Sequence, residues 1–414
     1  MRRQKQGERS KVELEVPTTN ARGLPAHAKS MQHFSQILRF IPRSIFESAV
    51  QKHQTEKHAK GMTSWSQFIA LLFCHLGGAR SLREIVGGLA ASEGKLKHLG
   101  VDRAPTRSTL AYANEHRPWQ LYKSMFDRLA AVCRDEAKEK KRKFRFHHPL
   151  LTLDATVIPV CVSMFEWASY VKTKGAVKLH LVLDNASFLP QYAVITPGNT
   201  GDVTAAKKME FTRGTILVFD RGYEDHNWWR KLNTTGVYFV SRLKDNASYI
   251  VAETRTVVDG TNVLHDEVVL LASDKELADP MRLRRIEVWL EDKQDTMVFI
   301  TNHLKLAAST IAAIYKDRWQ IELFFKAIKQ SLRIKTFIGT SENAVQTQIW
   351  TALIAMLLVR YLQLRSTWKW GLSNLVALLR QQLFVYRDLW GWINEPFHSP
   401  IALDDGQLPL LIDG

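Results

Sequence analysis

The sequence has few cysteines and no long hydrophobic run, and these two shortages exclude several classes of protein. Cys74, Cys133 and Cys161 form no CxxC pair and no Cys/His zinc spacing, which excludes a disulfide scaffold and a zinc finger. The longest apolar run, residues 349–359, is too short to span a membrane and is followed directly by Arg360. The basic N-terminus has no apolar stretch behind it, so no secretory signal is visible. We therefore expect a cytoplasmic protein that does not enter a membrane.

Acidic residues are also in short supply relative to basic ones. The 414 residues include 57 Lys and Arg but only 41 Asp and Glu, which gives a net charge of +16. With 45% hydrophobic residues the chain can still bury a sizeable core. Such a basic globular protein favours a polyanionic partner, nucleic acid first and an anionic membrane surface second.

The hydrophobic pattern is helical in the first third of the chain. Residues 28–137 carry apolar side chains at helical spacing, and Ser81 stands three residues before Glu84, as in a capping box. Short helices with tight turns and basic flanks are typical of a helix-turn-helix-like DNA-binding module. A helical domain that only packs against the rest of the protein fits the pattern equally well.

The pattern then changes to short apolar runs. From residue 150 onward, three runs typical of strands precede alternating helices and strands, which predicts an α/β mixed sheet flanked by helices. An alternating polar and apolar stretch predicts an antiparallel β insertion, and long helices are expected at about 307–336 and 342–366. We predict a polar tail at 1–27, a helical DNA-binding domain at 28–137 and a basic linker at 138–149. The catalytic domain follows in two parts, at 150–247 and 304–366, with the β insertion between them at 248–303. The chain is predicted to end in a C-terminal helical and loop region at 367–414.

Two aspartates interrupt strands that are otherwise apolar. Asp154 lies in LTLDATV and Asp220 in LVFDRGY, where the strand gives way to a glycine turn. A charge between buried residues is costly unless a counter-charge or a metal compensates it. A single such aspartate is most simply explained as a cap of the next turn. Two of them on one predicted sheet favour a functional site.

A third carboxylate lies on the helix predicted for residues 315–332. At 100° per residue, Arg318, Glu322 and Lys329 fall on one stripe, beside an apolar face centred on Ile321, Phe324, Phe325, Ile328 and Leu332. A surface ion pair between Arg318 and Glu322 would contribute only a few tenths of a kcal/mol. A carboxylate needed for metal binding, with cations nearby for phosphates, explains the stripe better.

Asp154, Asp220 and Glu322 together can hold two divalent cations. Mg²⁺ suits all-oxygen sites with few protein ligands and bound phosphate, and we expect that Mn²⁺ can substitute. Two such ions about 3.5–4 Å apart would activate the attacking oxygen and stabilise the leaving one in phosphodiester cleavage. The sequence therefore predicts these three residues as both catalytic and metal-binding.

At these residues the chain resembles a bacterial DDE transposase of the insertion-sequence-four family. The tyrosine–arginine–glutamate–lysine signature is present with every spacing as Tyr315, Arg318, Glu322 and Lys329. The aspartates match as LDATVI and FDRGY, and the similarity extends over roughly residues 30–360. This resemblance implies a ribonuclease-H-like catalytic domain with a β-rich insertion before the last catalytic helix. The 102 residues between Asp220 and Glu322 leave room for such an insertion.

The resemblance also implies roles and partners. Tyr315, Arg318 and Lys329 would contact the DNA backbone at the transposon end, and Trp289 is the candidate for stacking on a flipped base. The substrates would be double-stranded terminal inverted repeats and target DNA, cut and joined through hairpin ends by a homodimer near the bacterial nucleoid. Further candidate DNA contacts are Arg333, on the same helix stripe as Arg318, and Arg221 and Tyr223, in FDRGY. Lys178 and His180, on a strand of the predicted hairpin that follows Asp154, complete the set.

Two other functions remain open from the sequence. One is an inactive, transposase-derived DNA-binding protein, and the other is a ribonuclease-H-type nuclease. The presence of all three carboxylates argues against the first, and the N-terminal helices with the signature cations argue against the second. Trp228, Trp229 and Trp319 are predicted to pack in the interior.

Overall fold

The fold begins with a group of helices. The computed structural model describes residues 31–397 apart from 58, 60, 93, 138–143, 161–168, 172–173, 273–277 and 333–336. The N-terminal helices are α1 (His33–Leu38), α2 (Arg43–His53), α3 (Ser64–Gly77), α4 (Leu82–Ala90), the short 3₁₀ helix η2 (Leu96–Leu99), α5 (Arg107–His116) and α6 (Gln120–Ala137). The predicted capping box is confirmed, because the Ser81 hydroxyl accepts from the Glu84 N–H and the Glu84 carboxylate accepts from the Arg80 N–H.

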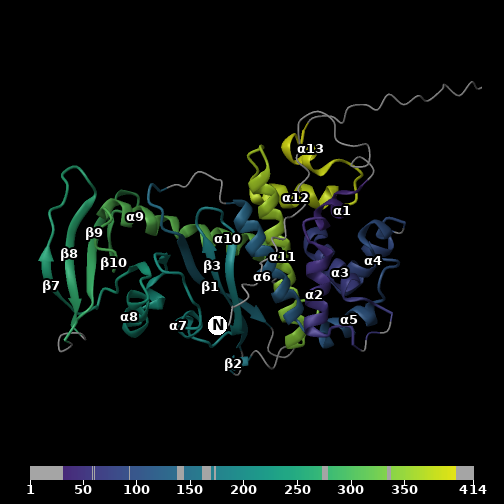
Figure 1. Cartoon of the computed structure of the whole chain (residues 1–414), viewed down its shortest axis with the longest axis horizontal. Helices are drawn as coiled ribbons and strands as arrows, with labels where there is room; N and C mark the ends of the chain where they lie inside the picture. The colour runs from purple at the N-terminus through teal and green to yellow at the C-terminus, as the bar shows by residue number, and fades with distance from the viewer. Residues whose placement is uncertain are drawn as a thin grey trace, which may run out of the picture.

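The centre of the molecule is a mixed sheet that continues into the insertion (Figure 1). Its strands are β1 (Leu150–Val160), β2 (Ser169–Val171), β3 (Lys174–Asp184), β4 (Pro190–Pro197), β5 (Ile216–Val218), β6 (Tyr238–Arg242), β7 (Tyr249–Thr254), β8 (Val263–Leu271), β9 (Arg282–Leu290) and β10 (Asp295–Thr301). The order is β2-β3-β1-β5-β6-β10-β9-β8-β7, with β4 also paired to β3. Among the strands that the structure describes, β1–β5 and β5–β6 are the parallel pairs, and the other pairs are antiparallel.

The last four strands form the predicted antiparallel insertion. They pair in sequence, β7 with β8, β8 with β9 and β9 with β10, and β10 joins the sheet beside β6. The helices α7 (Asp202–Ala206) and α8 (His226–Thr234) and the 3₁₀ turn η4 (Arg221–Tyr223) connect the central strands. The predicted α/β class is confirmed: a ribonuclease-H-like mixed sheet with helices, an N-terminal helical region and a β insertion.

The predicted helix at about 307–336 is wrong in one respect, because the structure divides it. α9 (Ala308–Asp317) and α10 (Trp319–Ser331) meet at Arg318. The chain tightens there, since the Arg318 N–H donates to Tyr315 O and the Ile321 N–H donates to Arg318 O. The predicted buried face of α10 is confirmed, with Ile321, Phe324, Phe325, Ile328 and Leu332 all at most 6% exposed.

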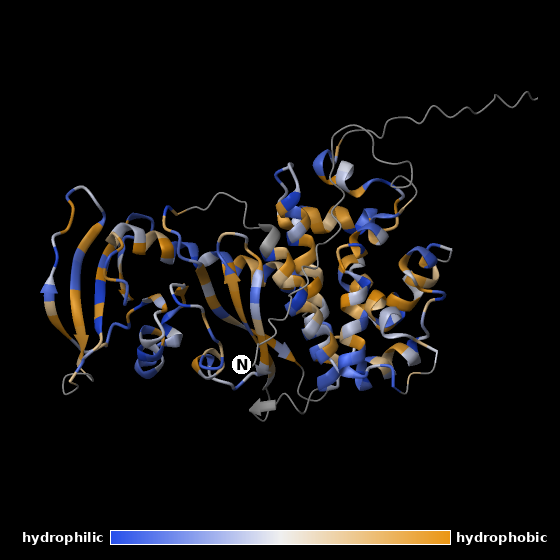
Figure 2. Ribbon diagram, in the orientation of Figure 1, coloured by the Kyte–Doolittle hydropathy of each residue, from blue (hydrophilic) through white to orange (hydrophobic). Residues whose placement is uncertain are grey.

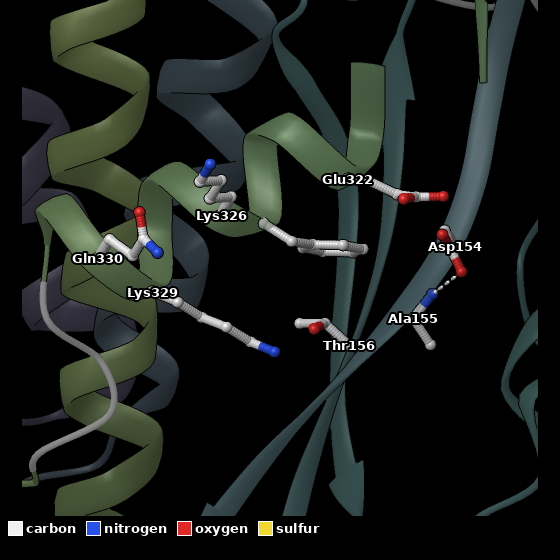
Figure 3. A pocket seen from close by; sticks show the side chains of 8 residues that line it. Asp154, Ala155, Thr156, Glu322, Lys326, Lys329 and Gln330 are labelled. Carbon is white, nitrogen blue, oxygen red and sulfur yellow. Dashed lines mark hydrogen bonds between the residues drawn. The ribbon is translucent and has the colours of Figure 1, made fainter. Parts of the chain in front are cut away.

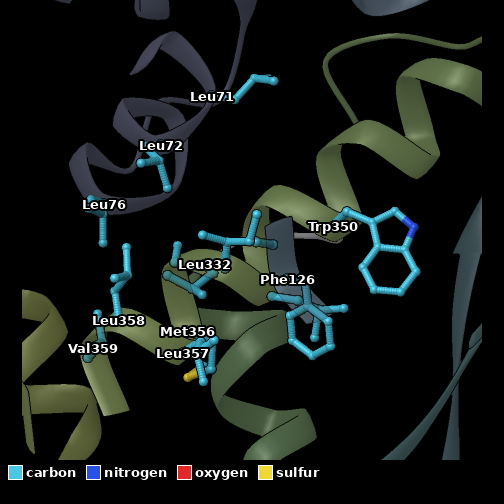
Figure 4. Close-up of a cluster of buried hydrophobic side chains, with 14 of the residues drawn as sticks. Leu71, Leu72, Leu76, Phe126, Leu332, Trp350, Met356, Leu357, Leu358 and Val359 are labelled. Atoms are coloured by element: carbon cyan, nitrogen blue, oxygen red, sulfur yellow. The ribbon is translucent and has the colours of Figure 1, made fainter. Parts of the chain in front are cut away.

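The largest core joins α10 to the N-terminal helices. α11 (Glu342–Arg365) runs through its centre, and α12 (Leu372–Gln382) and α13 (Leu389–Asn394) cover one end (Figure 1). Side chains of α3, α6 and α11 meet Leu332 at the end of α10 (Figure 4), and Figure 2 shows how hydrophobic residues concentrate in these helices. α11 is long and apolar enough to cross a membrane, but 94% of its most apolar window is buried inside the fold, as in a core helix.

Candidate active site

Parallel pairing of β1 and β5 brings the two aspartates together. Thr152 is in register with Val218, the last residue of β5; Asp154 lies two residues further along β1, and Asp220 lies two residues beyond the end of β5. Side chains two residues apart on a strand share a face, so Asp154 and Asp220 lie on the same side of neighbouring strands. Both aspartates lie just beyond the point where the parallel pairing of β1 with β5 ends, which is where open α/β sheets place their functional groups.

Asp220 is held by the turn that follows it. Its Oδ1 accepts from the Gly222 N–H at 2.9 Å, and its carbonyl accepts from the Ser241 hydroxyl at 3.2 Å. A Cβ on Gly222 would lie 3.0 Å from Asp220 Oδ1, so a side chain there would press on the carboxylate. The glycine in FDRGY therefore lets the backbone come close enough to fix Asp220.

Arg318 connects the first aspartate to the glutamate. Its Nη1 donates to Asp154 Oδ2 at 3.0 Å, and its Nη2 donates to Glu322 Oε1 at 2.5 Å. The side chains of Arg318, Asp154 and Glu322 are 16%, 17% and 33% exposed, so the network is partly shielded from water. The surface ion pair considered from the sequence thus exists, but it is one half of a bridge between α10 and β1.

The carboxylates influence one another. The pKa of Asp154 is raised to about 6, first by burial and then by the charges of Asp220 and Glu322, which together outweigh the lowering effect of the Ala155 N–H and the Arg318 guanidinium. Within the described part of the chain, no three acidic, histidine or cysteine side chains are close enough to form a ready metal cluster. The donor set nevertheless fits a hard divalent cation, because it consists of carboxylate oxygens whose negative charges are only partly compensated.

A pocket of about 450 Å³ opens beside Asp154 and Glu322 (Figure 3). Its basic wall comes from α10, where Lys326 and Lys329 lie one turn or more beyond Glu322. Lys329 Nζ donates to the Val157 carbonyl on β1 at 2.9 Å. The pocket therefore presents two carboxylates at one end and two ammonium groups along one side, which suits a phosphate chain next to a cation site.

Tyr315 and Arg242 complete the site on the side of β6. The Tyr315 ring is 8% exposed and packs on Phe299 at 5.0 Å, and Arg318 lies over it at 5.7 Å. Burial raises the pKa of Tyr315, Arg318 and Arg242 lower it, and Asp220 raises it. Sequence reasoning missed Arg242, whose only signal is its position as the last residue of a buried strand. Its buried Nε has no hydrogen-bond partner among the described residues.

Lys178 and His180 do not reach this site. The register places Lys178 opposite Val157 and His180 opposite Ala155, on the sheet face that α7 covers. Asp202 of α7 lies 3.1 Å from Lys178 Nζ and 3.6 Å from His180 Nδ1, and His180 is fully buried. These positions contradict the prediction that the two residues are exposed DNA contacts, because an internal carboxylate already occupies them.

The remaining predicted DNA contacts are scattered. Tyr223 is 1% exposed, which contradicts a contact at the surface, whereas the Arg221 side chain is 52% exposed next to Asp220. Val288 of β9 belongs to the same core cluster as Tyr315 and the buried residues of α9. Because neighbouring side chains on a strand point to opposite faces, Trp289 points away from that cluster. Arg333 lies outside the described residues.

Trp319 corrects the prediction that it packs in the interior. Trp228 and Trp229 are buried as predicted, but Trp319 is 57% exposed and Leu323, one turn later, is 45% exposed. The break at Arg318 sets the start of α10, so that Trp319 stands at the surface directly beside the residue that bridges the carboxylates. The sequence did carry a signal for this exposure, because at 100° per residue Trp319 falls on the side of the helix opposite the apolar face.

A ribonuclease-H-like sheet with one aspartate on β1, one directly after β5 and a glutamate on α10 is the arrangement typical of nucleic-acid phosphoryl-transfer enzymes, and the family match agrees with this class. Residues 145–358 match the family described as "Transposase DDE domain", and the chain belongs to this family. It is an insertion-sequence transposase, a metal-dependent enzyme that cleaves and joins DNA. Residues 30–102 match a family described as a domain of unknown function, DUF4372.

Curated relatives agree with this assignment. A protein of Sinorhizobium fredii named as transposase y4zB is 33% identical over 69% of this chain and 80% of its own length. A Geobacillus stearothermophilus protein, named as the probable transposase for insertion sequence element IS5377, is 27% identical over 62% of this chain and 67% of its own. Among solved structures, a piggyBac transposase synaptic complex with hairpin DNA aligns with a TM-score of 0.43 at 10% identity, over 92% of this chain and 84% of that one.

Proposed function

We propose that Asp154, Asp220 and Glu322 are the catalytic carboxylates and that they hold two Mg²⁺ ions, with Mn²⁺ as a substitute. The proposal is supported by the convergence of β1, β5 and α10 and by the mutual effect of the carboxylates on the pKa of Asp154. When bound, the ions supply an activated oxygen nucleophile and stabilise the leaving oxygen of the phosphodiester.

The bridge formed by Arg318 carries this proposal. One guanidinium contacts both Asp154 and Glu322, so it provides the positive charge that two partly buried carboxylates need. A divalent cation that binds these carboxylates would take over this compensation. Arg318 is then available to the DNA phosphates, for which its planar fork is suited. Arg318 would thus hold Asp154 and Glu322 in the free protein and bind DNA phosphates in the metal-bound protein.

The basic side of the pocket would position the DNA strand. Lys326 and Lys329 line it, and Arg221 extends positive charge past Asp220. Trp319, exposed next to Arg318, would stack on a base near the cleaved bond. These residues bind and orient the DNA, while the low exposure of Asp154 keeps bulk water away from its carboxylate.

The remaining details are inferred from the resemblance. The substrates are the terminal inverted repeats of the element and a target duplex, and the ends are joined by cut-and-paste transfer through hairpin intermediates. The assembled form is a homodimer that pairs two ends, in the cytoplasm near the nucleoid. The membership of the insertion-sequence-four group rests on the spacing of Tyr315, Arg318, Glu322 and Lys329.

The test is cleavage of DNA by the purified chain. A duplex ending in the inverted repeats that flank the gene, and a matched duplex with scrambled ends, are incubated with and without Mg²⁺. We expect nicking at the repeat end, a hairpin product and strand transfer into a plasmid, all dependent on Mg²⁺. Binding of the repeat without cleavage would overturn the enzymatic proposal, and equal cleavage of both duplexes would indicate a nuclease that does not recognise ends.

A further inference from the structure

Two segments that are far apart in the chain meet at the surface beside α1. The first is η2 with Lys95 directly before it, and the second is the loop between α12 and α13. An isolated β-bridge joins Gln32, the residue before α1, to Tyr386 in that loop. The His33 N–H also donates to Val385 O at 3.1 Å. Figure 1 shows α1 beside α12 and α13, so the N-terminal and C-terminal helical regions form one surface here.

The polar side chains at the start of α1 are buried and hold the backbone of both segments. Gln32 Nε2 donates to Lys95 O at 2.7 Å, and Ser35 Oγ donates to His98 O at 2.8 Å. Gln36 Nε2 donates to a backbone carbonyl of the α12–α13 loop at 2.6 Å. These three side chains belong to residues that are at most 9% exposed. Because a buried donor without a partner is costly, the two segments are fixed relative to each other.

The side chains that these segments present to solvent are basic and aromatic. Lys95 Nζ lies 5.9 Å from the centre of the Tyr386 ring, and the His98 ring meets the same ring edge-on at 6.0 Å. Tyr386 is 44% exposed, and Lys97 and His98 are exposed as well. No carboxylate among the described residues pairs with Lys95 or Lys97. We refer to Lys95, Lys97, His98 and Tyr386 as the Tyr386 surface.

The chemistry of the Tyr386 surface matches the backbone of nucleic acid. Lysine ammonium groups and tyrosine hydroxyls are common donors to phosphate oxygens in protein–DNA interfaces. Two ammonium groups without a carboxylate partner attract phosphates more strongly than compensated ones do. A surface whose backbone is already fixed also loses little conformational freedom when it binds. Lysines that only face solvent would not require three buried side chains to hold the segments that carry them.

We propose that the Tyr386 surface is a second DNA contact, which binds the backbone phosphates of a duplex away from the cleavage site. The pocket at the cleavage site lies between β1 and α10, and Figure 1 shows α11 between these elements and α1. The inference rests on the DNA binding of the proposed function and does not depend on its metal chemistry. One enzyme can thereby hold a duplex at two separate places.

The experiment compares the double variant Lys95→Gln/Lys97→Gln with a matched control, Lys208→Gln/Lys231→Gln. The control lysines are exposed, one beyond the end of α7 and one on α8, so each double variant removes two positive charges. Binding is measured by fluorescence anisotropy over a salt series without divalent cations. The duplexes are a repeat-end duplex and an unrelated one that represents the target. The second readout is the cleavage rate of repeat-end DNA with Mg²⁺ at saturating protein.

We expect Lys95→Gln/Lys97→Gln to lower the magnitude of the salt slope by about two units, because each lysine contacts one phosphate. Its cleavage rate at saturation and the slopes of the control pair should match the parent. A change with the repeat-end duplex alone would assign the transposon end to this surface, and a change with the unrelated duplex alone would assign the target.

Unchanged slopes with both duplexes would overturn the inference, as would an equal decrease in the control pair, which would show a general charge effect. A parent that binds DNA without cleaving it would overturn the chemistry of the proposed function, while the slopes would still decide this inference. A parent that binds neither duplex would overturn both.

Discussion

Arg318 Nη1 and Asp154 Oδ2 lie 3.0 Å apart, although the two residues are 164 positions apart in the chain. The contact joins the break between α9 and α10 to the middle of β1, and the second arm of the same guanidinium reaches Glu322. Arg318 therefore sets the distance between a strand and a helix that carry two of the three carboxylates. A residue expected from the resemblance to touch phosphate is also part of the architecture of the free site.

Arg318→Lys tests this double role. Lysine keeps the charge but lacks the planar fork that contacts two carboxylates at once. We expect cleavage of repeat-end DNA to fall roughly tenfold to a hundredfold and the melting temperature to change little. Arg282→Lys, at an exposed ion pair with Glu253, is the control and should leave both unchanged. Full activity of Arg318→Lys would show that charge alone is sufficient at this position.

The three carboxylates make a sharper prediction. Asp154→Asn, Asp220→Asn and Glu322→Gln each keep the side-chain shape but weaken a hard-cation ligand. Each should lower cleavage by several orders of magnitude while end binding, measured by gel shift, stays close to that of the parent. The control is Asp245→Asn, because the Asp245 side chain is 93% exposed and its ion pair with Arg221 is long, at 3.8 Å. If any one of the three variants cleaves nearly as well as the parent, that residue has no metal role.

The sequence was sufficient to place Asp154 on a strand, Asp220 at the turn that follows a strand, and Glu322 on a helix. Local apolar runs determine such elements, and the periodicity of α10 correctly identified its buried face. The helix break at Arg318 could not be predicted, because no proline or glycine marks it. It depends on tertiary contacts, namely the pairing of Arg318 with Asp154 on another strand.

The failures share a physical cause. Lys178 and His180 are polar residues that the sequence treats as exposed, but the partner that buries them, Asp202, comes from a helix whose position only the fold determines. Trp319 fails in the opposite direction, since hydrophobicity favours burial and its exposure depends on how α10 starts. Single-sequence patterns report which face of an element is apolar, but not which neighbour covers a polar side chain.

Trp319→Ala separates a DNA contact from a core residue. Because Trp319 is 57% exposed, its removal should change the free energy of unfolding by less than about 0.5 kcal/mol. The binding free energy for repeat-end DNA should weaken by about 1–3 kcal/mol if the ring stacks on a base. Trp229→Ala is the contrasting variant, since Trp229 is fully buried and its loss should cost about 3–5 kcal/mol of stability. Unchanged DNA affinity in Trp319→Ala would exclude the stacking role.

Salt dependence of DNA binding is expected to be steep. A net charge of +16 implies that phosphate contacts and counterion release provide much of the affinity. The logarithm of the binding constant should fall linearly with the logarithm of salt concentration, in titrations by fluorescence anisotropy. Lys326→Gln should lower the magnitude of the slope by about one unit if that side chain contacts one phosphate. A binding constant that does not change with salt would contradict the electrostatic model.

The buried histidine His75 predicts a loss of stability in acid. His75 Nδ1 contacts the Leu332 carbonyl at 3.1 Å and Nε2 contacts the Thr351 hydroxyl at 3.0 Å, so it ties α3 to the end of α10 and to α11. Burial lowers its pKa from 6.5 to about 4. The unfolded chain therefore binds a proton between these values that the folded protein does not. The stabilisation is complete above about pH 6.5 and is lost as the pH falls toward 4, on the order of 3 kcal/mol in all.

Urea unfolding at pH 7 and at pH 5 measures this effect. The parent should lose free energy of unfolding between the two values, and His75→Gln, which is less stable at pH 7, should lose less. His265→Gln is the control, because His265 is exposed on β8 and should not alter the pH dependence. Since His33, His180 and His303 also have pKa values lowered to about 4, part of the loss should remain in His75→Gln. A pH dependence identical to that of the parent would mean that His75 is not the neutral link between α3 and the end of α10.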